Sequence, residues 1–296
     1  MHNPVMTLPI VFTKMHGAGN DFVVLDGRAG LADHVLQPTT LQRLADRRFG
    51  VGADQILVVE SSPDPRADFV YRIFNADGQE VEQCGNGARC FARYVIDHQL
   101  APGPSIRVLT KAGLITPTVE PSGDVTVDMG RPDLRAQSLP FLVQGLATEV
   151  VGGQSRYALE PPGSTQIWFA PVSMGNPHLV TWVSDLDQAA VAAIGSWLQS
   201  HERLPQRVNV GFGQVLSRNS LRLRVFERGA GETLACGTGA CAAVVSGVAQ
   251  GLLQADESIE VQTRGGLLHI RWPGTPTEAV SMTGPAVTVF TGEIHL

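Results

Sequence analysis

Four cysteines fall in two pairs along the chain, and two of them stand where a reactive thiol could form. Cys84 and Cys90 make the first pair, and Cys236 and Cys241 make the second. Cys84 and Cys236 are each followed by glycine and then by a segment with the pattern of a helix. The unpaired N–H groups of a helix N-terminus carry partial positive charge, which lowers the pKa of a thiol. We therefore expect Cys84 and Cys236 to be reactive, and Cys90 and Cys241 to be small buried residues.

The glycines beside Cys84 and Cys236 indicate a bound anion. Glycine lets the backbone come close to a ligand, and free N–H groups at a helix start bind a carboxylate well. If the two halves of the chain face each other, the two thiols could lie on opposite sides of one carbon atom. One thiolate would then remove an α-proton while the opposite thiol delivers another. This pattern predicts an amino-acid epimerase that uses neither a cofactor nor a metal.

Spacing and cellular compartment bear on the other roles that four cysteines could have. A zinc site is disfavoured because the second cysteine of each pair lies inside an expected helix. A disulfide between Cys84 and Cys236 is geometrically conceivable, but in a reducing cytoplasm it would be an oxidised, inactive form. A non-catalytic redox sensor with such a reversible disulfide stays open as an alternative.

The elements that must position the two cysteines are similar in the two halves. Cys84 and Cys236 lie 152 residues apart, and the same offset lays Tyr71-Arg72-Ile73-Phe74 over Leu223-Arg224-Val225-Phe226 and Glu80 over Glu232. Both copies read as a strand, a Gly-rich turn and a helix. The alternation of apolar and polar residues predicts strands at 69–74 and 221–226, followed by helices at 87–96 and 239–245. The sequence therefore predicts a duplicated architecture.

The rest of the chain is predicted to be mostly short strands with few helices. Strands are expected at 105–110, 124–129, 167–172 and 278–282, and further helices at 40–49 and 186–201. Asp185 is the expected N-cap of the last of these helices. Together these elements predict an α+β fold.

Composition and charge exclude several classes of function. Among 296 residues there are 22 basic and 28 acidic ones, a net charge of −6, and no basic run that could bind nucleic acid. The apolar stretches are too short to span a bilayer. The N-terminus lacks the basic-then-apolar pattern of a signal peptide, so we expect a cytoplasmic protein with reduced thiols.

Polar motifs accompany both cysteines along the chain. They are Met15-His16-Gly17-Ala18-Gly19-Asn20-Asp21-Phe22, Gly50-Val51-Gly52-Ala53-Asp54-Gln55, Phe74-Asn75-Ala76-Asp77-Gly78, Cys84-Gly85-Asn86-Gly87-Ala88-Arg89-Cys90, Met174-Gly175-Asn176-Pro177-His178, Arg207-Val208-Asn209-Val210, Phe226-Glu227-Arg228-Gly229 and Cys236-Gly237-Thr238-Gly239. In this order they resemble the motifs of the diaminopimelate epimerase family over nearly the whole chain.

The resemblance implies a fold and an activity. The fold is α+β, with two pseudo-symmetric domains, each a curled, mostly antiparallel β-sheet around a central α-helix. The first lobe would comprise residues 1–130 and 283–296, and the second residues 131–282, with one catalytic cysteine in each. The implied activity is interconversion of LL- and meso-diaminopimelate without pyridoxal phosphate, in bacterial lysine and peptidoglycan precursor synthesis. The family expectation is a homodimer that binds only a small-molecule substrate.

The resemblance also implies site residues by motif position. Cys84 and Cys236 correspond to the acid–base pair. The implied substrate-binding set is Asn20, Gln55, Asn75, Gly85, Asn86, Asn176, Asn209, Glu227, Arg228, Gly237 and Thr238. His178 and Glu227 resemble groups that tune the thiol pKa. Taken singly, Asn75 also suits a turn, His178 a loop, and Glu227-Arg228 a solvated surface pair.

The nearest competing enzyme class is the proline racemases. They share the logic of two thiols, but in one half they pair Cys-Gly with histidine. Here the neighbours are Gly85-Asn86 and Gly237-Thr238. The related phenazine-biosynthesis isomerases lack the cysteine pair.

Overall fold

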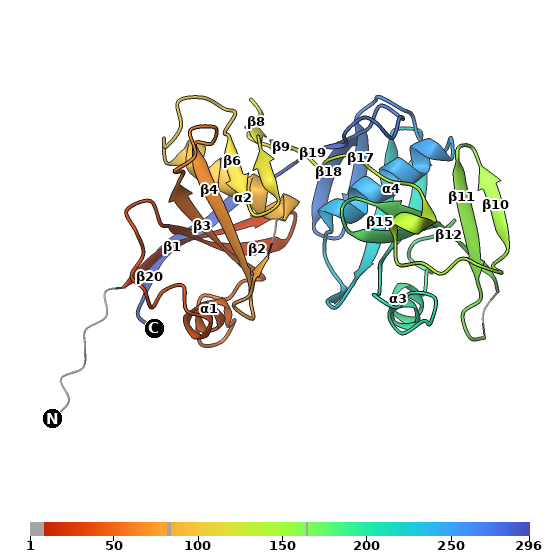
Figure 1. Cartoon of the computed structure of the whole chain (residues 1–296), viewed down its shortest axis with the longest axis horizontal. Helices are drawn as coiled ribbons and strands as arrows, with labels where there is room; N and C mark the ends of the chain where they lie inside the picture. Colours follow the sequence, from red (N-terminus) through yellow and green to blue (C-terminus); the bar gives the residue numbers. More distant parts are fainter. Residues whose placement is uncertain (1–8, 82–83, 164) are drawn as a thin grey trace. The chain divides into compact units, whose positions relative to one another are not determined.

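The chain divides into two sheet-rich units with few helices (Figure 1). The structure is a computed structural model and describes residues 9–81, 84–163 and 165–296. The first unit is Met1–Val127 with Gly284–Leu296, and the second is Asp128–Thr283. Residues 1–8, on which the expected absence of a signal peptide rests, lie outside the described residues. The predicted α+β class is confirmed.

The first unit is built on one mixed sheet with two helices. Its strands follow the order β20-β1-β2-β3-β4-β6-β7, with β5 paired to β4. The elements are β1 (Ile10–Gly17), β2 (Asn20–Asp26), α1 (Pro38–Ala45), β3 (Gln55–Ser61), β4 (Phe69–Asn75), β5 (Glu80–Val81), α2 (Gly85–Asp97), β6 (Val108–Thr110), β7 (Gly113–Ile115), β8 (Thr118–Val119), β9 (Val125–Asp128), which ends at the boundary between the units, and β20 (Val287–Ile294).

The second unit has the same plan. Its strands follow the order β10-β11-β12-β13-β14-β15-β17-β18-β19, with β16 paired to β15. The elements are a 3₁₀ turn (Ala136–Ser138), β10 (Thr148–Val151), β11 (Gln154–Leu159), β12 (Ile167–Ser173), β13 (Pro177–Trp182), α3 (Val191–Gln199), β14 (Asn209–Ser217), β15 (Ser220–Glu227), β16 (Gly231–Glu232), α4 (Gly237–Ala249), β17 (Ile259–Thr263), β18 (Gly266–Arg271) and β19 (Ser281–Gly284).

The predicted duplication is confirmed by the pairing pattern of the two sheets. In the first unit β1–β2, β3–β4 and β6–β7 are antiparallel, whereas β2–β3 and β4–β6 are parallel. The corresponding series β12–β13–β14–β15–β17–β18 repeats these directions step by step. The equivalent ion pairs Arg72–Glu80 and Arg224–Glu232, with N–O distances of 2.9 and 2.7 Å, close the short β4–β5 and β15–β16 hairpins.

Strand direction brings the polar motifs to one edge of each sheet. Because β2 and β3 are parallel and β4 is antiparallel to β3, the first residues of β2 and β3 and the last of β4 share an edge. These residues are Asn20, Gln55 and Asn75. In the second unit the starts of β13 and β14 meet the end of β15 in the same way. The central helices α2 and α4 then begin shortly after β4 and β15.

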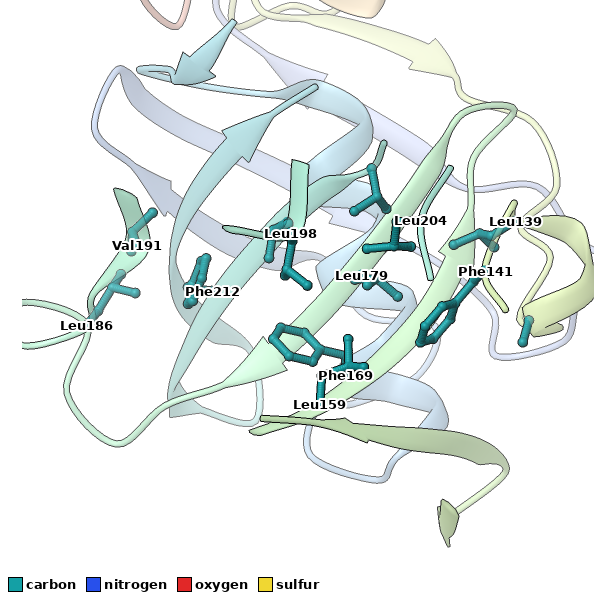
Figure 2. Packing of buried hydrophobic residues seen from close by; sticks show 13 residues of the cluster. Leu139, Phe141, Leu159, Phe169, Leu179, Leu186, Val191, Leu198, Leu204 and Phe212 are labelled. Atoms are coloured by element: carbon teal, nitrogen blue, oxygen red, sulfur yellow. The ribbon is translucent and has the colours of Figure 1, made fainter. Parts of the chain in front are cut away.

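Apolar burial explains why each sheet curls around a helix. α2 packs on β1, β2 and β3, while α4 packs on β12 to β15 and on β18. Residues 239–247 of α4 are all buried, as expected of a helix that is covered on every side. A separate cluster on the other side of the second sheet includes Leu179, Phe212 and Leu198 of α3, as seen in Figure 2.

Two predicted helices begin or end at the wrong residue. In both places an aspartate side chain accepts hydrogen bonds from backbone N–H groups. The helix predicted at 186–201 is α3, which starts at Val191 after Ala190. Asp185 does not cap it, since its carboxylate accepts the N–H of Asp187 at 2.9 Å and closes a turn. The helix predicted at 40–49 ends at Ala45, where Asp46 accepts the N–H groups of the next turn.

The strand predictions hold at most positions. Those at 69–74, 221–226, 124–129 and 167–172 match β4, β15, β9 and β12 within two residues. The strand expected at 105–110 begins only at Val108, and the one at 278–282 is β19, shifted toward the C-terminus. Within the described ranges, no helix is long and apolar enough to cross a bilayer.

We predict that Gly87→Ala destabilises the chain, because the side chain of Tyr71 leaves no room for a methyl group at this position of α2. An ideal Cβ at Gly87 would lie 2.3 Å from the hydroxyl oxygen of the buried Tyr71. Overpacking of this kind costs about 1–3 kcal/mol. The equivalent Gly239→Ala is the control, since its Cβ would meet Val225 at 3.0 Å and force a smaller adjustment. Urea unfolding of both variants measures the difference, and equal losses would contradict the close approach.

Candidate active site

Cys84 and Cys236 are the N-cap residues of the two central helices. Both have extended backbone angles, and their carbonyl oxygens accept the first helical bonds, from Ala88 and Ala240, at 2.8 and 2.9 Å. The N–H groups of the first turn therefore have no acceptor within the helix. They belong to Gly85-Asn86-Gly87 and Gly237-Thr238-Gly239. The prediction that a helix begins just after each cysteine is confirmed.

Amide side chains surround the half-buried Cys84. Its Sγ lies 3.7 Å from Oδ1 of Asn20, and the same oxygen accepts a hydrogen bond from Nδ2 of Asn86 at 3.3 Å. Asn86 is buried, and among the described residues its own Oδ1 has no hydrogen-bond partner. The backbone carbonyl of Cys84 accepts the hydroxyl of Tyr71 at 3.5 Å.

Gln55 and Asn75 form a second polar pair at the same sheet edge. They face each other across β3 and β4, and Nε2 of Gln55 donates to Oδ1 of Asn75 at 2.9 Å. Asn75 also begins the turn toward β5, because its carbonyl accepts the N–H of Gly78. Asn75 therefore serves the turn while its side chain stays at the edge.

Cys236 lies in a more buried environment than Cys84. Its Sγ is 3.6 Å from Oγ1 of Thr238, and the N–H of Gly239 donates to it. Burial raises the pKa of the Cys236 thiol well above its usual value, the nearby Glu227 raises it further, and the bonds from Thr238 and Gly239 oppose this only in part. The expected lowering of the thiol pKa is therefore wrong for Cys236, because loss of hydration outweighs the helix N-terminus.

A chain of hydrogen bonds connects His178 to Thr238. Nε2 of His178 is 2.9 Å from Oδ1 of Asn176, and Nδ2 of Asn176 donates to Oγ1 of Thr238 at 3.2 Å. Burial, together with the charge of Arg228, lowers the pKa of His178 to about 3. His178 is thus a neutral imidazole that donates through Nε2.

Asn209 holds the turn that presents Arg228. Its Nδ2 donates to the carbonyl of Pro177 at 3.1 Å, and its Oδ1 accepts the N–H of Arg228 at 2.9 Å. In the described part of the chain no carboxylate lies within ion-pair distance of the Arg228 guanidinium. Glu227, next to it, accepts the hydroxyl of Thr233. An unpaired guanidinium at this edge is available to a carboxylate ligand.

The structure thus brings the expected site residues together within each unit. Asn20, Gln55, Asn75, Gly85 and Asn86 lie at the sheet edge of the first unit with Cys84. A second set, around Cys236 in the second unit, comprises Asn176, His178, Asn209, Glu227, Arg228, Gly237 and Thr238. That both sets contact one ligand stays a prediction. Among the described residues, no group of three His, Cys, Asp or Glu side chains could hold a metal ion.

Sequence reasoning missed a charged network behind Asn20. Nδ2 of Asn20 donates to Oδ2 of Asp54 at 2.9 Å, and Arg47 bridges Asp54 and Asp21 with N–O distances of 2.7 Å to each. Lys14 adds a further ion pair to Asp21. Although Asp21 is partly buried, the hydrogen bonds from Arg47 and Lys14 hold its pKa well below the usual range. Both aspartates stood inside quoted motifs, but the contacts of Asp54 with Asn20 and with Asp21 join residues more than 30 positions apart.

The burial of His178 predicts a pH dependence of stability. The pKa of His178 is about 3 in the folded chain, against 6.5 for an unburied histidine. Below pH 6.5, therefore, this histidine binds a proton in the unfolded chain but stays neutral in the folded chain. Stability is therefore lost as the pH falls. Between pH 7 and pH 5 we expect the free energy of unfolding to fall by about 2 kcal/mol more in the original chain than in His178→Gln. Chemical denaturation at both values, with the exposed His295→Gln as a control, measures this, and parallel slopes would argue against a neutral His178.

Comparison with known proteins assigns the chain to a family. The family model described as diaminopimelate epimerase matches residues 12–135 and 170–289. A diaminopimelate epimerase of Acidovorax ebreus is 56% identical over 293 residues, covering 97% of this chain and 98% of the relative. A diaminopimelate epimerase of Herminiimonas arsenicoxydans is 54% identical, covering 98% of this chain and all of the relative.

Solved structures of more distant proteins share the fold. A PhzF-family phenazine biosynthesis protein of Bacillus anthracis matches with a TM-score of 0.68 at 18% identity, over 98% of this chain and 100% of that one. A probable proline racemase of Agrobacterium radiobacter matches with a TM-score of 0.67 at 16% identity, over 97% and 93%. At this level of identity, these similarities show only that the fold is shared. With the motif order, the paired helix starts and the near full-length identity, the chain belongs to the diaminopimelate epimerase family.

Proposed function

We propose that the chain interconverts LL- and meso-diaminopimelate by passing an α-proton between the substrate and two thiols, those of Cys84 and Cys236. The observation that carries this proposal is the presence of a cysteine at the N-cap of both central helices. Family membership specifies the substrate. The product would serve lysine and peptidoglycan precursor synthesis in the cytoplasm.

The reaction balances with these groups alone. One cysteine, as a thiolate, takes the α-proton, and the electron pair of the broken C–H bond moves toward the α-carboxylate. The opposite thiol then gives its proton to the other face of the carbon and becomes the thiolate. The reverse reaction exchanges the roles, and no electron acceptor is needed. The two lobes, residues 1–130 with 283–296 and residues 131–282, would each supply one cysteine.

The free N–H groups of the helix starts have a defined task in this scheme. An α-proton is very weakly acidic, so charge that develops on the carboxylate must meet donors that are already oriented. The first-turn N–H groups of Gly85-Asn86 and Gly237-Thr238 are such donors. The glycines leave room for the carboxylate to approach them.

The remaining polar residues suit the recognition of an amino-acid head. Neutral amides can hydrogen-bond ammonium and carboxylate groups, and the unpaired Arg228 can bind a carboxylate. We assign substrate binding to Asn20, Gln55, Asn75, Asn86, Asn176, Asn209, Glu227 and Arg228. A site of fixed hydrogen-bonding groups rejects analogues that leave those groups unpaired.

Glu227 and His178 are proposed to tune the thiol of Cys236. Glu227 raises the pKa of this thiol, so Cys236 keeps its proton in the empty site and its thiolate, once formed, is the stronger base. His178 acts at a distance through Asn176 and Thr238, because its N–H fixes the orientation of the amide between them. Neither residue is proposed to exchange protons with the substrate.

We also propose that the chain forms a homodimer through the edge strand β20. This strand ends the first sheet and exposes Val287, Val289 and Phe290 by 43–55%, beside Val11 of β1 at 69%. An edge strand with exposed apolar residues readily pairs with another copy.

Val289→Lys should shift the chain from dimer to monomer. A charged lysine at an edge position opposes strand pairing. Light scattering after size exclusion would measure a mass near 31.6 kDa instead of twice that value. The control Leu114→Lys changes a residue of similar exposure, 51%, on the opposite edge strand β7. An unchanged mass for Val289→Lys would exclude β20 as the interface.

Cys84→Ala and Cys236→Ala should each reduce turnover by about a thousandfold or more, because each removes one of the two proton-transfer groups. The assay follows deuterium incorporation at the α-carbon of LL-diaminopimelate in D₂O, under reducing conditions. Cys90→Ala and Cys241→Ala are the controls, since both cysteines are buried inside α2 and α4, and these variants should alter mainly stability.

Three outcomes of this assay would count against the proposal. Normal turnover in either Cys84→Ala or Cys236→Ala would refute the acid–base pair. Exchange into free proline in place of diaminopimelate would favour a racemase of the proline type. Exchange into neither compound would favour a redox sensor.

A further inference from the structure

Asn20 points its side-chain oxygen toward Cys84, and a hydrogen bond on the other side of the amide fixes this orientation. The amide nitrogen donates to Oδ2 of Asp54 at 2.9 Å. A carboxylate only accepts hydrogen bonds, so turning the amide over would place two oxygens against each other. Oδ1 of Asn20 is thereby kept toward Sγ of Cys84, at 3.7 Å, and toward Nδ2 of Asn86.

The hydrogen bond between the two amides does not by itself decide their orientation. Oδ1 of Asn20 accepts from Nδ2 of Asn86, while the buried Oδ1 of Asn86 has no partner among the described residues. If both amides turned over, one hydrogen bond would still join them, and Nδ2 of Asn86 would be left without a partner instead. The contact with Asp54 therefore decides which way the amide of Asn20 points.

Asp54 is itself held in place by the charged network. Its Oδ1 accepts a hydrogen bond from the guanidinium of Arg47 at 2.7 Å, and its backbone N–H donates to Oδ1 of Asp21 at 2.9 Å. Arg47 contacts both oxygens of Asp21, at 2.8 and 2.7 Å, and Lys14 contacts one of them. Arg47 and Lys14 thus hold the carboxylates of Asp21 and Asp54 in place. Asp54 in turn holds the amide of Asn20.

In the second unit the corresponding amide, that of Asn176, has the opposite orientation. There Asn176 turns its nitrogen toward Thr238, and the Thr238 hydroxyl, 3.6 Å from Cys236, remains able to donate to the sulfur. Cys84 faces an oxygen that only accepts, so its S–H is the natural donor. A thiolate at Cys84 would be repelled by the same oxygen.

We propose that Asp54 is a positioning residue that, through the amide of Asn20, keeps a proton on Cys84. This inference rests on the proposed function for its catalytic meaning, namely that Cys84 awaits substrate as the acid. The charged and titratable groups on the elements packed here are Lys14 on β1, Asp21 on β2, Arg47 after α1, Asp54 before β3, Tyr71 on β4, and Arg89 and Cys90 on α2.

The test titrates Cys84 directly, without substrate, so that it stays informative if diaminopimelate is not turned over. The intact chain is alkylated with iodoacetamide at a series of pH values, and the peptide that contains Cys84 is quantified by mass spectrometry. In Asp54→Asn the amide of Asn20 is free to turn its nitrogen to the sulfur. The pH of half-maximal alkylation should then fall by about one unit.

Two further variants separate positioning from a mere change of charge. Asp68→Asn removes a comparable surface carboxylate, paired with Arg107, in the same unit and should leave the midpoint unchanged. Asn20→Ala removes the acceptor and should lower the midpoint by itself. In the Asn20→Ala background, Asp54→Asn should cause no further shift, because its effect passes through Asn20.

The proposal is overturned by any of three results. The first is an unchanged or raised midpoint in Asp54→Asn. The second is an equal shift in Asp68→Asn or an additive shift in the double variant, either of which would indicate charge acting through space. The third is a raised midpoint in Asn20→Ala, which remains measurable even if Asp54→Asn does not fold.

Discussion

The ionisation of Cys84 and Cys236 depends on two opposing effects, the loss of hydration on burial and the partial positive charge of a helix N-terminus. The first-turn N–H groups favour a negative charge at Cys84 and Cys236, whereas burial opposes it. At Cys236 burial prevails, and Glu227 adds to it, so the thiol keeps its proton. A thiol of this kind is a weak acid, and its thiolate, once formed, is a strong base. Under the proposed mechanism, substrate charge would have to alter this balance before a proton moves.

Duplication explains how one such site could arise twice and still differ. The two units repeat their strand directions, their Arg–Glu hairpin pairs and the position of the cysteine. The side chains between the sheet edge and the sulfur are not repeated. Asn86 and Thr238 occupy equivalent places, and the amides of Asn20 and Asn176 have opposite orientations. A repeated scaffold with different polar contacts suits a reaction in which one group gives a proton and the other takes one.

Much of this architecture could be predicted from local patterns. Both strands before the cysteines and both helices after them were placed correctly, because alternation, glycine and apolar spacing act over a few residues. The misplaced ends of α1 and α3 have one cause, since Asp46 and Asp185 bind backbone N–H groups and so compete with the helix. The candidate site residues follow from motif resemblance, whereas the partners of Asn20 do not. The contact of Asn20 with Asp54 depends on the parallel pairing of β2 and β3, which no local pattern encodes.

The route of the chain through the first sheet has a consequence for synthesis. β1 lies between β2 and β20, so a strand that is made after the whole second unit completes the sheet that was begun first. The second unit is one uninterrupted stretch and can assemble while translation continues. Until β20 has been made, the outer edge of β1, with the exposed Val11, has no strand beside it. During that interval the unpaired edge is a template on which a strand of a neighbouring chain can pair.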